Sequence, residues 1–296
     1  MYHYHKYEDD VSKLEYISLK NAKNSLELCP QYGAAISNLK LNNKPIIKNP
    51  EAIDSPHIYA SSILFPFVNR IENGRYTYNG IDYQLSKNEN TKLNAIHGLV
   101  YNQTFKIESY TLKDEKASIT LSYTSKSTEF EGFPFQFKIQ LKYTLRKNTL
   151  LLKVTVENCD TNAFPFSLGW HPYFFTKNYD NRQLFFASTS RLKTNETLIP
   201  YGFEEQSVSE LLINRPYDDC YKLDNDKVVF DTEDYKLQLN SNSKTNYLQL
   251  YTPQNPELLA IEYMTAPANC FNSNIDVLVL QPKEIFSTTW TIKLIS

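Results

Sequence analysis

The sequence FQFKIQLKYTL, residues 135–145, alternates apolar and polar side chains over eleven residues without interruption. A period of two over this length is typical of a β-strand with one buried face. Residues 146–148 (RKN) then predict a turn, and the alternation resumes at Leu150 and continues to Val156. The two segments therefore predict a long antiparallel strand pair with a single apolar face.

Similar patterns predict strands elsewhere, at residues 118–125, 228–230, 235–239, 247–251, 258–262 and 288–294, with two or three more between 24 and 47. Asn79-Gly80, inside residues 75–85, supplies the two positive φ angles of a type I′ hairpin turn. We expect one short helical turn at residues 207–212 and an irregular polar loop at 176–195.

Many strands without intervening helical periods favour a β-sandwich or barrel over a βαβ architecture. Single all-β domains commonly reach roughly 200–250 residues. The sequence shows no linker or repeat, so we expect residues 1–296 to form one domain.

The charge balance points to small, neutral partners. The chain has 31 basic and 33 acidic residues and no basic block, which leaves little electrostatic attraction to nucleic acid or to an anionic membrane. The polar start of the chain lacks the apolar core of a signal peptide, and no run approaches the roughly 18 apolar residues of a membrane span. We therefore expect a cytoplasmic protein that binds neither nucleic acid nor membrane; its oligomeric state is left open.

Neither the cysteines nor the first histidines indicate a metal site. The cysteines are far apart and form no C-x-x-C pair, which predicts isolated thiols and not a zinc site or a disulfide framework: Cys29, Cys159, Cys220 and Cys270. His3 and His5 lie near a chain end that we expect to be frayed, with both side chains exposed.

The segment GWHPYFF, residues 169–175, follows the strand pair and places His171 among aromatic side chains. Such a segment suits a sugar site, because flat apolar rings can contact C–H groups and an imidazole can move protons. Histidines are also often packed inside a core. The segment alone does not decide between these readings.

Two further segments combine polar residues with unusual surroundings. Asn69-Arg70 follows an apolar run, and the planar guanidinium can either bind substrate hydroxyls or form a surface ion pair. His97 precedes Gly98, which permits a turn or a close backbone approach. A single histidine in this setting is more often structural.

Acidic residues occur in two strand-like segments. Asp218 and Asp219 are adjacent, so in a strand one can enter a site while the other is solvated; we favour Asp218. Glu262 ends an apolar strand, where a carboxylate serves either in catalysis or as a polar end of the strand.

The known nucleotide and metal motifs are missing from the sequence. The seven glycines never take G-x-G-x-x-G or G-x-x-x-x-G-K-[ST] spacing, and neither G-x-S-x-G nor H-E-x-x-H occurs. The remaining chemistry is proton transfer by Glu and His. We expect no cofactor and no metal.

Together, these segments resemble the aldose 1-epimerase, or galactose mutarotase-like, family. The resemblance runs in order from about residue 26 to 294. Its motifs are Asn69-Arg70-Ile71, Asn79-Gly80, His97-Gly98, residues 169–174, Asp218, Glu262 within 261–269, and residues 280–284 before Thr289-Trp290. It implies a large antiparallel β-sandwich of the galactose mutarotase-like (supersandwich) type, with the sugar in an open cleft on one sheet.

The resemblance also implies roles for individual residues. Glu262 falls on the general base and His171 on the general acid. The implied substrate-binding positions are Asn69, Arg70, His97 and Asp218. A carboxylate with a pKa of about 4.3 is ionised at pH 7, and an imidazole with a pKa of about 6.5 can donate a proton.

Two positions depart from the family pattern. Tyr263 stands where Pro or Thr commonly follows the base, and we expect it to alter the cleft wall. Lys283 replaces the usual Gly of a late turn; we expect it to change only that turn, which argues against a catalytic role for Glu284.

The leading hypothesis is a mutarotase that interconverts the α and β anomers of a free aldohexose. A hexose-6-phosphate 1-epimerase ranks lower, because the six arginines do not cluster near any motif. A non-catalytic carbohydrate-binding protein is the alternative of a different class. A purely structural β-sandwich would leave Glu262, His171 and His97 far apart.

Overall fold

The alternating stretch forms a strand of a large antiparallel sheet. The computed structural model describes residues 1–48, 59–89, 91–177 and 180–296. Strand β13 (Phe137–Arg146) pairs with β14 (Thr149–Asn158), from Phe137↔Asn158 to Arg146↔Thr149. Leu141 and its partner Val154 are fully buried, whereas Lys142, the next residue on β13, is exposed. The predicted strand pair with one apolar face is confirmed.

Within the described residues, this sheet has 14 strands. Eleven of them follow one another in the order β11-β12-β13-β14-β25-β21-β20-β22-β23-β16-β6, while β17 pairs with β23 and β18 with both β19 and β20. The strands besides β13 and β14 are β6 (Ser62–Leu64), β11 (Lys106–Leu112), β12 (Lys116–Thr124), β16 (Gly169–His171), β17 (Tyr173–Phe175), β18 (Gln183–Thr194), β19 (Pro200–Leu212), β20 (Asp218–Asp231), β21 (Lys236–Ser241), β22 (Tyr247–Tyr251), β23 (Leu258–Met264) and β25 (Ile285–Leu294).

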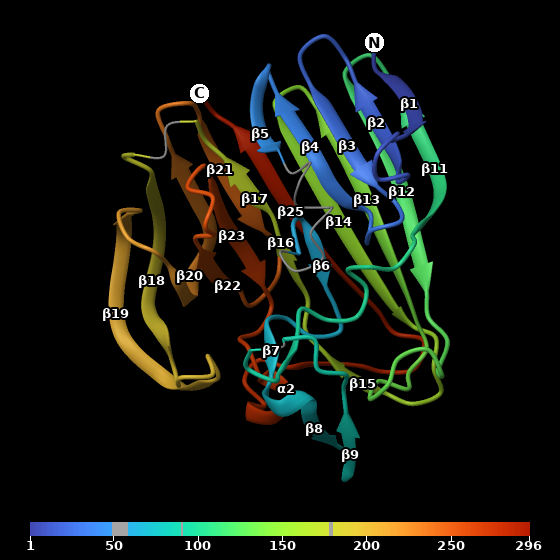
Figure 1. Ribbon diagram of the computed structural model, residues 1–296, viewed down its shortest axis with the longest axis vertical. Helices are drawn as coiled ribbons and strands as arrows, with labels where there is room; N and C mark the ends of the chain where they lie inside the picture. The colour runs from blue at the N-terminus through green and yellow to red at the C-terminus, as the bar shows by residue number, and fades with distance from the viewer. Residues whose placement is uncertain (49–58, 90, 178–179) are drawn as a thin grey trace.

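A second sheet packs against the β11–β14 half of the first (Figure 1). It contains, in order, β1 (His3–Glu8), β2 (Glu15–Lys20), β3 (Ser25–Cys29), β4 (Ala35–Leu41) and β5 (Lys44–Lys48). Leu26 and Ile36 of this sheet belong to the same buried cluster as Leu141, and the Tyr143 hydroxyl donates a hydrogen bond of 2.8 Å to the Ala34 carbonyl oxygen. The fold is therefore an all-β sandwich, as the sequence predicts.

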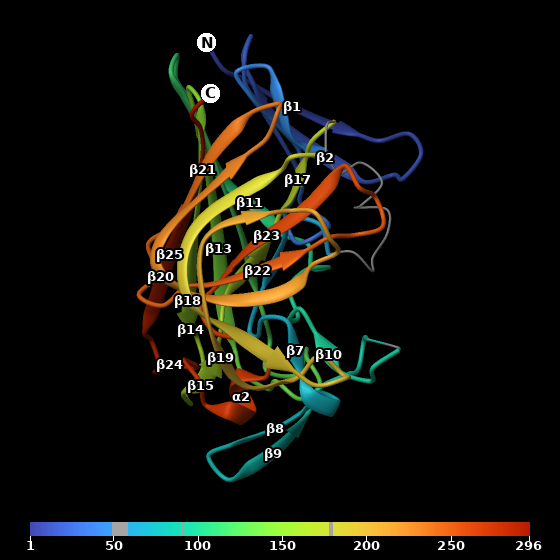
Figure 2. The same ribbon diagram turned by 90° about the vertical axis from the view of Figure 1, so that its left-hand side faces the viewer.

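Short elements complete the chain. They are β7 (Arg70–Ile71) with β10 (Ala95–Ile96), β8 (Arg75–Tyr78) with β9 (Ile81–Gln84), β15 (Phe164–Phe166) with β24 (Leu278–Leu280), the 3₁₀ turn Glu72–Gly74 and helix α2 (Cys270–Ser273). The β8–β9 hairpin projects from one end of the molecule, beside α2 (Figure 2). Asn79 and Gly80 at its tip have φ angles of 50° and 74°, which confirms the predicted turn.

Three predictions about local structure are wrong. Residues 207–212 belong to strand β19 and form no helical turn, and most of the predicted loop at 176–195 is strand β18; residues 178–179 lie outside the described residues. The chain start is not frayed, because β1 pairs with β2 from His3↔Lys20 to Glu8↔Glu15, although His3 and His5 are exposed as expected. These strands are held by backbone hydrogen bonds, which need no apolar alternation.

Among the helices of the described residues, none has the length and apolar character needed to span a membrane.

The buried face of β13 gives a stability prediction. Replacement of Leu141 by Ala leaves a cavity in the core and lowers the free energy of unfolding by about 2–5 kcal/mol. The neighbouring Lys142→Ala is the matched control and changes it by about 0.5 kcal/mol or less, because Lys142 faces solvent. Urea unfolding of the two variants checks this, and equal losses would contradict the assignment of faces.

Candidate active site

The register of neighbouring strands places polar residues in rows on one face of the large sheet. Gln249 of β22 pairs directly with Glu262 of β23. Directly paired residues of antiparallel strands project from the same face, and the next residues on that face are two positions away. The adjacent row accordingly runs from Asp218 through Tyr251 and Ala260 to Tyr173. These two rows form the floor of a cleft.

His171 extends the first row beyond Glu262. Its Nε2 lies 3.3 Å from Glu262 Oε1, and the two side chains are only 5% and 2% exposed. The preceding residue, Trp170, is buried on the opposite face, where its ring stacks on Trp290 with centroids 6.1 Å apart. Glu262 does not end its strand as expected, because β23 continues to Met264.

Pairing of β7 with β10 brings His97 beside Asn69. The His97 backbone N–H donates to the Asn69 carbonyl oxygen at 2.8 Å, and the imidazole ring centroid lies 5.0 Å from that of His171. Gly98 has a φ of 76°, and a Cβ atom there would lie 2.3 Å from the Phe65 carbonyl oxygen. The predicted close backbone approach at Gly98 is confirmed.

Arg70 is held in a partly buried ion pair with Glu89. Its Nε donates to both Glu89 carboxylate oxygens, at 2.9 and 3.1 Å, and its Nη2 lies 2.9 Å from Oε1. Both side chains are 12% exposed. A further bond of 3.1 Å joins Arg70 Nη1 to Asn69 Oδ1. The guanidinium is thus fixed in orientation by an ion pair, which is partly buried at the cleft and not on the open surface.

The adjacent aspartates have different surroundings. Asp218 accepts a hydrogen bond of 2.8 Å from Gln249 Nε2 and lines the cleft. Asp219 is not solvated as expected, because its carboxylate accepts bonds of 2.8 Å from both Arg191 and Arg215 and is 14% exposed.

These residues surround one cavity of about 410 Å³. All six predicted site residues line it: Asn69, Arg70, His97, His171, Asp218 and Glu262. Aromatic walls come from Tyr59, Tyr173 and Tyr251. Besides His171, Tyr173 is the residue of the 169–175 segment that lines the cavity, while Trp170 and Phe174 pack in the core.

Sequence reasoning missed four polar residues of the cleft, Asn88, Glu89, Thr91 and Gln249. Gln249 had a usable signal, since it is the polar residue in the otherwise apolar segment YLQLY, residues 247–251. No local sequence signal marked Glu89, because its pairing with Arg70 depends on the path of the chain between β9 and β10.

Burial changes the acid–base properties of the cleft. Loss of hydration raises the pKa of Glu262 well above its usual value; Asp218 raises it further, and Arg70 opposes the rise. Burial lowers the pKa of His171 to about 4, and burial together with the charges of His171 and Arg70 lowers that of His97. The expected pKa values of about 4.3 and 6.5 are therefore wrong for this site.

Three buried polar atoms of the cleft lack a hydrogen-bond partner in the described part of the chain: Glu262 Oε2, His171 Nδ1 and His97 Nδ1. Buried polar atoms without partners are uncommon and costly. Their convergence on one cavity is typical of a site that a polar ligand completes.

The two departures from the family pattern lie outside this cavity. Tyr263 projects to the core face, where its hydroxyl donates to the carbonyl oxygens of Asp226 and Leu239 at 2.9 and 3.1 Å; the expected effect on the cleft wall is wrong. Lys283 adopts a φ of 66° in a turn, and Glu284 accepts a bond from the Gln281 N–H of the same turn, as expected.

A comparison with known families agrees with this geometry. The sequence model of the family described as aldose 1-epimerase matches residues 15–293. The chain belongs to the aldose 1-epimerase family. Aldose 1-epimerases are isomerases, so the protein is a sugar epimerase of the mutarotase type.

Relatives and solved structures extend the comparison. The chain is 28% identical over 270 residues to the uncharacterized protein YihR of Escherichia coli K12, covering 84% of this chain and 83% of that protein. It is 28% identical to the galactose mutarotase of Sus scrofa over 49% of this chain and 42% of that enzyme. A galactose mutarotase-like protein from Clostridium acetobutylicum shares the fold, with a TM-score of 0.85, 20% identity and coverage of 99% and 98%.

A titration follows from the burial of His171. Because its pKa is lowered to about 4, the imidazole stays neutral at about pH 5.5, where a solvated imidazole is mostly charged. Nitrogen NMR of histidine-labelled protein measures the midpoint, and the spectrum of His171→Asn identifies the signals. A midpoint at or above about 6.5 would contradict the burial argument.

Proposed function

We propose that this protein interconverts the α and β anomers of a free aldohexose. The observation that supports this most directly is the contact between two buried ionisable groups, His171 Nε2 and Glu262 Oε1, at 3.3 Å. Each residue also carries a second buried polar atom without a partner in the described chain. Binding alone needs no such acid–base pair.

The proposed reaction moves two protons about one carbon. The Glu262 carboxylate takes the proton from the O1 hydroxyl, the C1–O1 bond becomes a carbonyl, the C1–O5 bond breaks, and His171 delivers a proton to O5. Rotation about C1–C2 exposes the other carbonyl face, and the reverse transfers close the ring with inverted C1. O1 and O5 are both bonded to C1, so two groups in contact with each other can serve both.

The shifted pKa values fit these roles. A general base works best when its pKa lies near the working pH, and burial moves Glu262 in that direction. The neutral imidazole of His171 can hydrogen-bond through its N–H to O5 as that oxygen gains charge and then pass the proton to it, so no buried cation is needed beforehand. His97, whose ring lies 5.0 Å from that of His171, supplies a second donor near the ring oxygen.

Arg70, Asn69 and Asp218 are proposed to bind the remaining hydroxyls. Arg70 is already oriented by Glu89, so little conformational entropy is lost when it binds a sugar. Asp218 accepts hydrogen bonds and is open to solvent at the mouth of the cleft.

The charges around the cleft favour a free sugar over a sugar phosphate. The expectation that no arginines gather near the motifs is wrong, since Arg191 and Arg215 meet at Asp219. These cations are already paired with carboxylates, however. Asp219 pairs with both Arg191 and Arg215, and Glu204 also pairs with Arg191. Arg70 is likewise paired with Glu89. A phosphate group needs cations that are not already neutralised.

The catalytic role of Glu262 is tested by Glu262→Gln, which keeps size and hydrogen-bonding capacity but cannot accept the proton. We expect mutarotation of α-D-glucose and α-D-galactose, followed by polarimetry, to slow by about 10²–10⁴-fold. Glu210→Gln, on the exposed surface of β19, is the control and keeps the wild-type rate.

Equal rates for wild type and Glu262→Gln would reject the assignment of the base. Saturable sugar binding by the wild type without any acceleration would instead favour the non-catalytic carbohydrate-binding protein.

The preference for an uncharged substrate gives a separate prediction. Anomerisation of glucose 6-phosphate should have a lower kcat/KM than that of glucose, because the carboxylates near Arg70 and Arg191 repel the phosphate. Proton NMR of both substrates measures the ratio. A higher value for the phosphate would favour a hexose-6-phosphate 1-epimerase.

A further inference from the structure

The charged groups that line the cleft are unequal in number. Among the described residues around this cavity of about 410 Å³, Arg70 is the one arginine or lysine, whereas three carboxyl groups line it: Glu89, Asp218 and Glu262. The imidazoles of His97 and His171 stay neutral at neutral pH, because burial lowers the pKa of both. Among these lining residues, Arg70 is therefore the cation that a charged substrate would meet.

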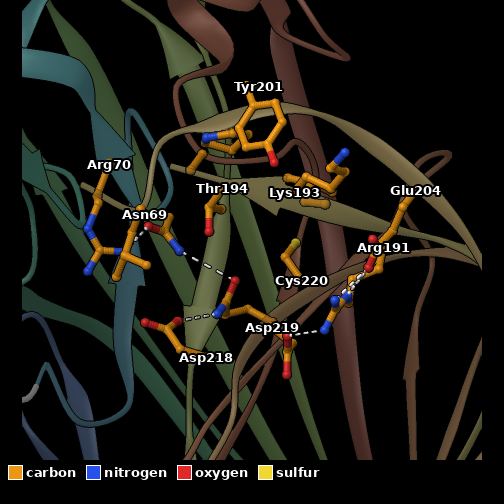
Figure 3. A pocket seen from close by; sticks show the side chains of 15 residues that line it. Asn69, Arg70, Arg191, Lys193, Thr194, Tyr201, Glu204, Asp218, Asp219 and Cys220 are labelled. Carbon is orange, nitrogen blue, oxygen red and sulfur yellow. Dashed lines mark hydrogen bonds and ion pairs between the residues drawn. The ribbon is translucent and has the colours of Figure 1, made fainter. Parts of the chain in front are cut away.

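Glu89 fills one edge of the Arg70 guanidinium. Its carboxylate lies 2.9 and 3.1 Å from Nε and 2.9 Å from Nη2, while Asn69 Oδ1 accepts a bond from Nη1 (Figure 3). Of the five guanidinium N–H groups, one on Nη1 and one on Nη2 remain for a substrate. The Nε–Nη2 edge, which could bind a substrate carboxylate through two bonds, is already taken.

A hydrogen-bond network holds the Glu89 carboxylate in this place. Asn94 Nδ2 donates to Glu89 Oε2 at 2.9 Å, and the backbones of the two residues pair as an isolated bridge. Asn94 is 1% exposed, and its side chain also binds the Asn73 N–H at 3.1 Å and the Thr197 carbonyl oxygen at 3.3 Å. Turning the carboxylate away from Arg70 would break the bond to Asn94 as well as the ion pair.

Orientation of Arg70 alone does not require a carboxylate. A neutral amide oxygen can accept a hydrogen bond from a guanidinium, as Asn69 Oδ1 does. What Glu89 adds is a full negative charge, which water screens only weakly because both side chains of the pair are 12% exposed. This charge offsets the attraction of Arg70 for an anion.

We propose that Glu89 restricts the cleft to uncharged aldoses. This inference rests on the proposed function, because it takes the substrate to be an aldose whose C1 lies at Glu262 and His171. Glu89 acts through Arg70: it holds the guanidinium in position for hydroxyl oxygens and cancels its attraction for a carboxylate on the sugar. It is a positioning residue that determines specificity and takes no proton from the substrate.

The test compares glucose with glucuronate, which has the same ring but carries a carboxylate in place of the C6 hydroxymethyl group. Proton NMR of anomer exchange gives kcat and KM for both sugars. Glu89→Gln keeps the size of the side chain and can still accept a bond from Arg70. We expect it to raise the ratio of kcat/KM for glucuronate to that for glucose about tenfold, through a lower KM for glucuronate. An equal loss of kcat/KM for both sugars would contradict the proposal.

Two further variants separate charge from shape. Glu89→Asp keeps the negative charge and should retain the wild-type ratio. The double variant Arg70→Gln/Glu89→Gln lacks the cation that attracts glucuronate, so it should lose the gain of Glu89→Gln. A raised ratio in Glu89→Asp, or a gain that persists in the double variant, would overturn the inference.

Glu108→Gln is the matched control. Glu108 forms an ion pair of 2.8 Å with Lys138 and is 32% exposed, and it lies on β11, at the end of the large sheet away from β23 and β16. The substitution removes the same charge from the protein and should leave the ratio unchanged. A rise equal to that of Glu89→Gln would indicate a general charge effect and reject the role of Glu89.

A binding measurement separates failure of this inference from failure of the proposed function. Calorimetric titration with glucose and glucuronate does not require turnover. If the wild type anomerises neither sugar but the ratio of the two affinities shifts toward glucuronate in Glu89→Gln, the proposed function fails and the selection by Glu89 stands. If glucose is anomerised and neither ratio changes in Glu89→Gln, the proposed function stands and this inference fails.

Discussion

The cleft depends on the two-residue alternation of the strands that form its floor. On β16, Trp170 packs against Trp290 in the core while the next residue, His171, faces Glu262. On β23, Tyr263 hydrogen-bonds inside the core while Glu262 faces the cleft. A shift of one residue in either strand would exchange the two sets. The same backbone hydrogen bonds thus determine both the packing of the core and the composition of the cleft.

A rigid floor allows ionisable groups to remain where burial disfavours their charge. Glu262 and His171 lie on strands bonded to neighbours on both sides, β22 and β16 for the strand of Glu262 and β23 and β6 for the strand of His171. The cost of their burial is offset by the packing of the sandwich, and it leaves both groups with altered proton affinities before any ligand enters.

The sequence was sufficient to predict the sandwich and six of the residues that line the cleft, because long alternation and ordered short motifs are local signals. Strands β18 and β19 were missed, since their serines, threonines and glutamates weaken the apolar pattern. The partners of Asp219 could not be predicted, because Arg191 and Arg215 reach it through strand pairing and turn geometry. The orientation of Tyr263 was predictable, since it must oppose that of Glu262.

The β18–β19 hairpin stands apart from the strands that carry Glu262 and His171. Within the described residues, β19 pairs with β18, and β18 joins the large sheet through β20. Side chains on this hairpin can therefore be replaced or lengthened without altering the register of β22, β23 and β16. Such an arrangement favours evolutionary divergence, in which the side chains of an edge hairpin change while the strands that carry Glu262 and His171 keep their register.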